Sequence, residues 1–435
     1  MLPKPRSGHA PCRVLALADD LSGAAETAAA LRLPGRIVLG PAAAAPPAEG
    51  EALVLDLDSR QLAAEEAARI VRDAVRDIAS GTVLLKKTDS LLRGNLAAEA
   101  AAYAQDADGL VIAPALPVAG RTIRGGVVHL HGAPLHTTDA WRAETSPVPH
   151  SVAAALGDLR TEVVPLAAVR AARQELAGLL HDLVAAGVRP VCDAETDADL
   201  DAITAAVLQL GHGVRLMGTG GLASALGRVL GRTDAPSPDD VHGERRPLLV
   251  VVGTAEPAAV AQIAQLTAAG ARHTALRADL LAKPGALLPF PVDPGAITVV
   301  SIDNSQGLRL GSARRVVAGL ARAIASVNLP ADLVLTGGET ARRVLDALGI
   351  GQLRPLGQIH HGAVHCRTPD GRSVVTRPGS YGDTGSLLRI ARALRPDHPL
   401  VTAEPFSTDP AVPGVEFVAP APPPPVSSVP QGDVQ

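Results

Sequence analysis

Aromatic residues are scarce in this sequence, with one Trp, two Tyr and three Phe among 435 residues. The bases of single-stranded nucleic acids stack on aromatic side chains, and a formal net charge of -4 offers no basic surface to a polyanion. We therefore expect no nucleic-acid partner. A hydrophobic content of 47% excludes wholesale disorder, so Leu, Val, Ile and Ala must fill the core.

Cysteine is scarce too, and the three cysteines, Cys12, Cys192 and Cys366, lie far apart. They form neither a disulfide framework nor a CxxC zinc motif. Histidines gather at residues 129–136 and 360–365, but without the spacing of a known zinc site. We therefore predict no metal site built from Cys or His.

Long apolar runs are missing as well. The first one, Val14–Ala18, is shorter than the roughly 7–15 residues of a signal-peptide core. The alanine-rich run Ala97–Ala102 contains a Glu and falls well short of the ~18 apolar residues of a membrane span. We expect a soluble, cytoplasmic protein with no membrane contact.

Short apolar runs do occur, and they alternate with longer alanine-rich helical patterns. Arg13–Ala18 precedes a helical pattern at Ala24–Leu31, and Thr82–Lys86 precedes another at Leu96–Tyr103. The same alternation resumes at Leu248–Gly253. This arrangement predicts an α/β fold of βαβ units with mainly parallel sheets.

A segment rich in Pro, Asp and Gly, GRTDAPSPDDVHGERRP, interrupts this alternation and predicts a linker. We place an N-terminal α/β domain at residues 1–235, the linker at 236–247 and a C-terminal α/β domain at 248–396. The proline-rich tail at 397–435 is expected to be disordered, because its proline density opposes both helix and central strand.

Polar residues follow two of the predicted strands near the N-terminus. Asp19 and Asp20, in ADDLSGAAET, stand between a strand and a helix, where ligands of open α/β sheets bind, although a carboxylate there could simply cap the helix. In LDLDSR, Asp56 is followed by the donor pair Ser59 and Arg60. The DxD spacing also occurs in haloacid-dehalogenase-type phosphatases, whose nucleophile would here be Asp56.

The densest group of polar residues is KKTDSLLRGN, residues 86–95, between a predicted strand and a helix. Lys87 supplies a point charge, and Arg93 carries a guanidinium that can bind a carboxylate at two points. Asp89 and Asn95 add a carboxylate and an amide. This variety exceeds what a solvated turn needs, so we interpret the segment as part of a binding site.

The segment GTGGLAS, residues 218–224, matches the dinucleotide-binding pattern G-x-G-x-x-A. The acidic residues at the expected spacing, Asp239 and Asp240, lie in the predicted linker rather than at a strand end, which argues against a dehydrogenase. The turn can still receive a phosphate or a carboxylate at the helix N-terminus.

Three glycine-rich turns follow predicted strands beyond residue 248: Gly253–Thr254, Gly337–Thr340 and TRPGSYGD at residues 376–383. Glycines let the backbone approach an anion without a Cβ, and a helix N-terminus supplies N–H donors. Each turn alone could be an ordinary C-cap or hairpin. Together they predict phosphate binding, while the sequence contains no P-loop motif G-x-x-x-x-G-K-[ST].

In this order, the motifs resemble those of the four-carbon acid sugar kinase family, whose members phosphorylate threonate, erythronate or oxo-tetronates with ATP. The resemblance covers about residues 14–393. It is carried by ADDLSGA, DLDSR, KKTDSLLRGN, APALPVAGRT at residues 113–122, SPVPHS at 146–151, GTGGLA, GGET and RPGSYGD. Leu91 departs from the family pattern, which has Thr there, and so removes one hydroxyl from the expected sugar site.

The resemblance implies that the first domain holds the acid sugar, the second holds ATP, and the active site lies in the cleft between them. ATP and Mg²⁺ are the expected cofactors. The sequence does not decide whether the chain forms a homo-oligomer. The expected substrate-binding residues are Asp19, Ser59, Arg60, Lys87, Arg93 and Asn95. The expected nucleotide-binding residues are Thr254, Gly337, Gly338, Glu339, Thr340, Gly379 and Gly382.

We expect Asp20 to be the catalytic base, because it ends a strand and opens a helix with Asp19 beside it. Asp89 is the alternative, since it lies among the cations that would hold the acid. Glu339 is expected to help hold Mg²⁺ through water. The competing interpretations are a phosphatase that uses Asp56 and a non-catalytic protein that binds a sugar acid or a nucleotide.

Overall fold

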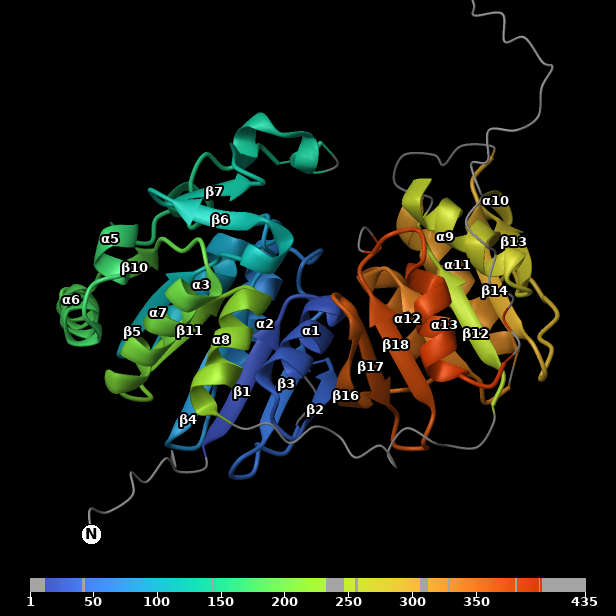
Figure 1. Cartoon of the computed structure of the whole chain (residues 1–435), viewed down its shortest axis with the longest axis horizontal. Helices are drawn as coiled ribbons and strands as arrows, with labels where there is room; N and C mark the ends of the chain where they lie inside the picture. The colour runs from blue at the N-terminus through green and yellow to red at the C-terminus, as the bar shows by residue number, and fades with distance from the viewer. Residues whose placement is uncertain are drawn as a thin grey trace, which may run out of the picture. The chain divides into compact units, whose positions relative to one another are not determined.

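The computed structural model describes residues 12–40, 44–142, 144, 146–231, 246–254, 257–305, 312–327, 329–379, 382–398 and 400. Its strands form one 15-stranded sheet and a separate three-stranded sheet (Figure 1). Most of the predicted linker, with Asp239 and Asp240, and nearly all of the predicted tail lie outside the described residues. The predicted domain boundaries therefore stay predictions.

The N-terminal part, residues 12–231, contributes eight parallel strands in the order β2-β3-β1-β4-β11-β5-β10-β9. These strands are β1 (Arg13–Ala18), β2 (Gly35–Leu39), β3 (Ala52–Asp56), β4 (Thr82–Lys87), β5 (Gly109–Ala113), β9 (Thr161–Val164), β10 (Arg189–Cys192) and β11 (Val214–Gly218). Its helices are α1 (Leu21–Leu31), α2 (Ala64–Ala74), α3 (Leu96–Ala104), α4 (Val152–Ala155), α5 (Leu166–Val169), α6 (Arg173–Ala185), α7 (Asp197–Gln209) and α8 (Gly220–Leu230).

The topology of this part brings the polar motifs together. β1 pairs with β3 on one side and with β4 on the other, so Ala18 lies in register with both Asp56 and Lys87. The chain order reverses at β1, which makes the carboxyl end of this strand a topological switch point, the usual ligand position in an open α/β sheet. The three predicted polar motifs therefore follow strand ends that lie at the same edge of the sheet.

The C-terminal part, residues 246–398, repeats this design with the parallel order β13-β14-β12-β15-β18. Its strands are β12 (Leu248–Val252), β13 (Arg272–Arg277), β14 (Ile297–Asp303), β15 (Asp332–Thr336), β16 (Gln352–His360), β17 (Ala363–Arg367) and β18 (Ser373–Arg377). Its helices are α9 (Pro257–Ala268), α10 (Ala278–Leu281), α11 (Ala313–Ser326), α12 (Gly338–Ala347) and α13 (Ser386–Leu394).

Two antiparallel strands, β16 and β17, join the two sets of parallel strands. β16 pairs with β2 through Leu353 opposite Ile37, and β17 pairs with β18. The predicted α/β fold with mainly parallel strands is confirmed. The strands form one continuous sheet rather than the two expected, because β16 completes the edge that β2 would otherwise expose.

A three-stranded arm lies outside this sheet and has no counterpart in the sequence-based prediction. It consists of β6 (Arg121–Arg124), β7 (Val127–Leu130) and β8 (Ala133–Pro134), drawn in teal in Figure 1. Asp193, which follows β10, accepts hydrogen bonds from the backbone N–H groups of Gly125 and Gly126 at 2.8 and 2.9 Å. These bonds hold the arm to the main sheet.

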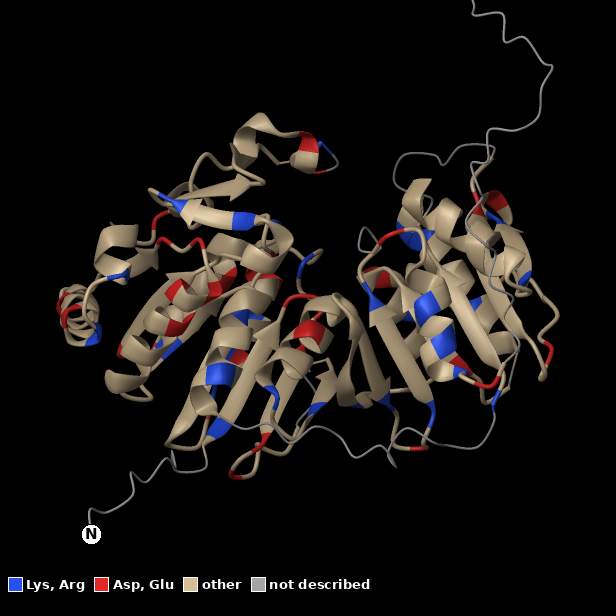
Figure 2. Ribbon diagram, in the orientation of Figure 1, with Lys and Arg blue, Asp and Glu red and all other residues tan. Residues whose placement is uncertain are grey.

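The core is aliphatic, as the scarcity of aromatic residues predicts. Buried Leu, Val, Ile and Ala fill it, and Tyr103 is the large aromatic side chain that is fully buried among the described residues. Within the described part, no helix is both long and apolar enough to cross a membrane. Figure 2 shows acidic and basic residues interspersed over both parts of the sheet.

Candidate functional site

Arg60 lies at the centre of the polar residues that follow β1, β3 and β4. Its guanidinium binds Asp19 at two points, with Nε 2.8 Å from Oδ2 and Nη2 3.0 Å from Oδ1. Nη1 donates to Asp20 Oδ2 at 2.7 Å, and Nη2 lies 3.7 Å from Asp89 Oδ1. The structure thus brings together four of the predicted site residues, drawn from three separate motifs.

Asp20 has two roles in this geometry. Its Oδ1 accepts a hydrogen bond from the backbone N–H of Gly23 at 2.8 Å and caps α1, while Oδ2 binds Arg60. The two interpretations considered for the sequence, helix cap and site residue, are therefore both compatible with the structure. Ser22, in the same motif, is a candidate that the sequence analysis did not name. Its buried hydroxyl has no hydrogen-bond partner among the described residues, a feature that appears only in the fold.

Asp89 is held more tightly than Asp20. It accepts from Arg93 Nε at 2.9 Å and Nη2 at 2.7 Å, and from the backbone N–H groups of Leu91 and Arg93. The two-point edge of the Arg93 guanidinium, expected to face the substrate, therefore faces Asp89.

The charges around these carboxylates set their protonation. Burial alone would raise the pKa of Asp89, but Arg60 and Arg93 hold it well below its ordinary value. Asp19 follows the same pattern, since burial opposes ionisation while Arg60 and two lysines lower its pKa. Both groups are carboxylates at neutral pH, and Asp89 in particular is a weak proton acceptor.

A buried ion pair lies beneath this network. Lys86 is fully buried and its ammonium lies 2.7 Å from Glu99 Oε2, while the Ser59 hydroxyl donates to the other Glu99 oxygen. Asn95 donates to the carbonyl groups of Ser59 and Leu62. Ser59 and Asn95, predicted as substrate ligands, thus fix the loop that carries Arg60.

Lys87 faces α1. Its ammonium donates to the Thr88 carbonyl at 3.0 Å and lies 4.0 Å from Glu26 Oε2. A Cβ added at Gly23 would come within 3.0 Å of Lys87 Nζ, and one added at Gly220 would overlap the Glu26 carboxylate. The turn GTGGLAS therefore adjoins the same site from the side of α8.

The glycine-rich turns of the C-terminal part also gather. β12, β15 and β18 are neighbours, and Thr336 lies in register with both Val252 and Arg377. A Cβ at Gly253 would overlap the Thr340 hydroxyl, and one at Gly379 would lie 3.4 Å from the Thr254 methyl. Gly382 lies beside α9 and α13, where its carbonyl accepts from Gln262.

The N-terminus of α12 meets the N-terminus of α1. A Cβ added at Gly338 would lie 3.0 Å from Ser22 Oγ and 3.1 Å from Asp20 Oδ2. A side chain at 338 would therefore fit only if Ser22 and Asp20 shifted by a few tenths of an ångström, so glycine suits this close approach. The first polar motif and the GGET turn, separated by more than 300 residues, therefore lie side by side.

Two ion pairs join α12 to the loop after β3. Arg342 Nη1 lies 2.8 Å from Asp56 Oδ2, and Arg343 binds Asp58. Asp56 is fully buried, and burial raises its pKa to about 7 although Arg342 opposes the shift. A buried, ion-paired carboxylate offers no free nucleophile, which argues against the phosphatase alternative.

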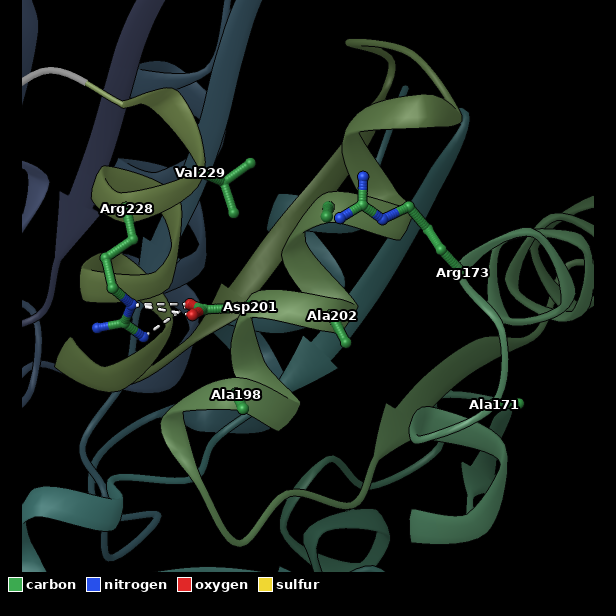
Figure 3. Close-up of a pocket in the computed structure, with 8 residues that line it drawn as sticks. Ala171, Arg173, Ala198, Asp201, Ala202, Arg228 and Val229 are labelled. Carbon is green, nitrogen blue, oxygen red and sulfur yellow. Dashed lines mark hydrogen bonds and ion pairs between the residues drawn. The ribbon is translucent and has the colours of Figure 1, made fainter.

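Other features of the described residues lie apart from this site. The pocket in Figure 3 is bounded by α7 and α8, and its Arg228 is already bound to Asp201 at 2.8 Å. It shares no residue with the predicted site. Within the described part, no group of three or more His, Cys, Asp and Glu side chains could hold a metal ion.

Comparison with protein families finds two matching models. A model described as a sugar-binding N-terminal domain matches residues 14–226, and one described as a nucleotide-binding C-terminal domain matches residues 293–387. The first match contains Asp19, Arg60 and Asp89, and the second contains the GGET turn.

Relatives of known function and a solved structure match this chain over most of its length. A D-threonate kinase of Cupriavidus necator is 34% identical over 409 residues, covering 87% of this chain and 97% of that protein. A D-threonate kinase of Bordetella bronchiseptica is 34% identical over 407 residues, covering 87% and 96%. The crystal structure of a Salmonella typhimurium protein shares the fold, with a TM-score of 0.69 at 21% identity over 87% of this chain and 98% of that one.

Proposed function

The chain belongs to the four-carbon acid sugar kinase family, and we propose that it transfers the γ-phosphoryl group of ATP to a hydroxyl of threonate or a closely similar four-carbon acid. The observation that carries this proposal is the close approach of Asp20 to Gly338. It places a carboxylate from the sugar-binding part beside a glycine-rich helix N-terminus of the nucleotide-binding part.

The acid is proposed to bind to the N-terminal part at the carboxyl ends of β1, β3 and β4. The polar groups there surround the carboxyl end of β1, the topological switch point of the sheet. The hydroxyls of Ser22 and Thr88 are buried there without hydrogen-bond partners among the described residues. Such hydroxyls suit the several hydroxyl groups of a short sugar acid, because each can both donate and accept.

The phosphates of ATP are proposed to bind at the turns that contain Gly253, Gly338 and Gly379. The N-terminus of α12 offers unpaired N–H groups, and Thr340 adds a hydroxyl beside Gly253. Phosphoryl transfer needs positioning and neutralisation of charge more than covalent chemistry, so closely packed backbone donors are well suited to it.

Asp20 is the proposed base. Its Oδ2 faces α12, where a transferred phosphoryl group would meet the acceptor hydroxyl, and Arg60 holds the carboxylate in place. Asp89 is less suited, because its surroundings lower its pKa and fill its oxygens with four donors. Asp20 would orient the hydroxyl and accept its proton late in the transfer.

Glu339 suits a Mg²⁺ ion bound with the nucleotide. It lies exposed in the first turn of α12 and forms no hydrogen bond or ion pair with any described residue. Mg²⁺ keeps several waters and takes one or two carboxylates together with substrate phosphates, so an exposed Glu beside the phosphate site fits it. The ion would offset the negative charge of the phosphates.

A coupled assay of ADP release tests the proposed function. The purified chain is given ATP with D-threonate, L-threonate, D-erythronate or their oxo forms, and with threitol as a neutral comparison. We expect ADP release that depends on one of the acids, with an acid phosphate ester as the second product. ADP release no greater than with ATP alone would contradict the proposal, and so would phosphate release from the ester without ATP.

A further inference from the structure

Three guanidinium groups surround the loop of residues 86–95, and two of them already hold carboxylates of the protein. Arg60 binds Asp19 at two points, and Arg93 binds Asp89 at two points. A guanidinium whose two-point edge is filled cannot offer that edge to a substrate carboxylate without first breaking an ion pair.

Arg121, on β6 of the arm, is the third guanidinium and is arranged differently. Its Nη1 donates to the hydroxyl of Ser90, and its Nε is buried with no hydrogen-bond partner among the described residues. No carboxylate of the described part lies within ion-pair distance of it. Its backbone is fixed, since the N–H and C=O groups of Arg121 both bond to Leu116.

The arm and the segment that follows it keep Arg121 beside the loop of residues 86–95. The Trp141 indole N–H donates to the Leu91 carbonyl at 2.9 Å, one residue beyond Ser90. β6 is also bridged to the main sheet, where the Ile123 N–H donates to the Ala194 carbonyl at 2.8 Å. The backbone that carries Arg121 is therefore held beside the loop, and the guanidinium reaches Ser90 from this fixed position.

We propose, resting on the proposed function, that Arg121 binds the carboxylate of the acid substrate and so determines the enzyme's preference for acids over neutral polyols. Ser90 assists, because its hydroxyl can turn to donate to the same carboxylate. Arg93 is then a positioning residue that holds Asp89.

Charge and position both support this role. A partly buried cation without a counter-ion is costly, and an arriving carboxylate removes that cost while forming a charge-assisted bond. Ser90 follows Asp89, which lies 3.7 Å from Arg60, and Arg60 binds Asp20. A ligand anchored at Arg121 can therefore extend along this chain of contacts toward the proposed base. Lys87 is turned to α1 instead, where it faces Glu26.

Calorimetric titration without nucleotide tests the proposal. D-threonate and its neutral amide, threonamide, are titrated into the wild-type chain and into R121Q, R121K and the matched control R124Q. Arg124 ends the same strand, is exposed, and pairs with Glu195. We expect wild type and R124Q to prefer the acid to the amide, and R121Q to bind the acid about 10- to 100-fold more weakly with that preference lost. R121K, which keeps the positive charge, should retain part of the preference for the acid.

The outcomes separate this proposal from the proposed function. A wild-type preference for the acid that persists in R121Q overturns the role of Arg121, even if ADP assays establish the kinase activity. Binding of threonate that depends on Arg121, with no acid-dependent ADP release, supports Arg121 and contradicts the kinase. If R121Q does not fold, the preference of R121K for threonate over threonamide decides. A preference equal to that of wild type would contradict binding of the carboxylate at two points by the Arg121 guanidinium. No threonate binding by wild type would overturn both proposals.

Discussion

At the scale of single residues, the role of each charged side chain depends on the partner to which it is bound. Arg60 contacts three carboxylates, and the sequence motifs identified all four residues without showing which would pair. Neighbours in sequence suggested that Lys87 and Arg93 act together, whereas the fold directs Lys87 to Glu26 and Arg93 to Asp89. Side-chain pairing depends on which strand ends meet, and that is a property of the tertiary structure.

Asp56 gives a prediction at this scale. Burial raises its pKa to about 7, from about 3.9 in an unfolded chain. A carboxyl group with a raised folded-state pKa contributes less stability as the pH rises from the unfolded to the folded value. In D56N that loss is absent, so the free energy of unfolding of D56N, relative to wild type, should increase by about 1 kcal/mol per pH unit between about pH 4.5 and 6.5.

Urea denaturation at several pH values measures this difference. The matched control is D77N, since Asp77 is exposed and forms no hydrogen bond or ion pair with any described residue. D77N should stay at a constant difference from wild type. A constant difference for D56N over the same range would show that Asp56 is ionised throughout.

At the scale of elements, the site is a meeting of two helix N-termini. α1 begins after β1 with Asp20 as its cap, and α12 begins after β15 with Gly337 at a positive φ of 94°. The glycine at 337 permits that turn, and the one at 338 permits the close approach of α1. Gly337 is therefore favoured by its backbone conformation, whereas a small side chain at 338 would require Ser22 and Asp20 to shift slightly.

G338V tests the element-scale part of the account. A valine side chain would collide with Ser22 and Asp20 and push the N-terminus of α12 away, so the KM for ATP should rise by about tenfold or more. Binding of the acid without nucleotide should weaken less than binding of ATP, because only Ser22 and Asp20 of the proposed acid site meet the new side chain. The control is G178V in α6, where no atom of the described residues lies within 4 Å of an added Cβ. An unchanged ATP titration in G338V would place the nucleotide elsewhere.

The elements that the sequence predicted are those with strong periodic patterns. The expected strand at Arg13–Ala18 has the predicted bounds, and the strand expected at Thr82–Lys86 and the helix expected at Leu96–Tyr103 each end one residue later. The arm of β6–β8 and strand β16 were missed. Their burial patterns are mixed, because each is covered on only part of its surface, so no clear period of two appears in the sequence.

At the scale of the whole molecule, the two parts are joined by the pairing of β2 with β16 and by the ion pairs of α12 with Asp56 and Asp58. Local sequence motifs, through their resemblance to the kinase family, implied a sugar-binding part and a nucleotide-binding part, and the family models match both. It could not predict that LDLDSR would bind the arginines after GGET, because that contact spans about 285 residues. The same limit concealed the contact of Asp20 with Gly338.

The central claim is that phosphoryl transfer occurs where Asp20 faces the N-terminus of α12. The most direct test is the single-turnover rate of transfer from ATP to the acid by D20N, with both substrates saturating. Asn keeps the helix cap and the size of the side chain, but it cannot accept the proton. We predict that transfer slows by about 10²–10⁴-fold while the Kd for each substrate stays near the wild-type value. Transfer by D20N at close to the wild-type rate would contradict the account.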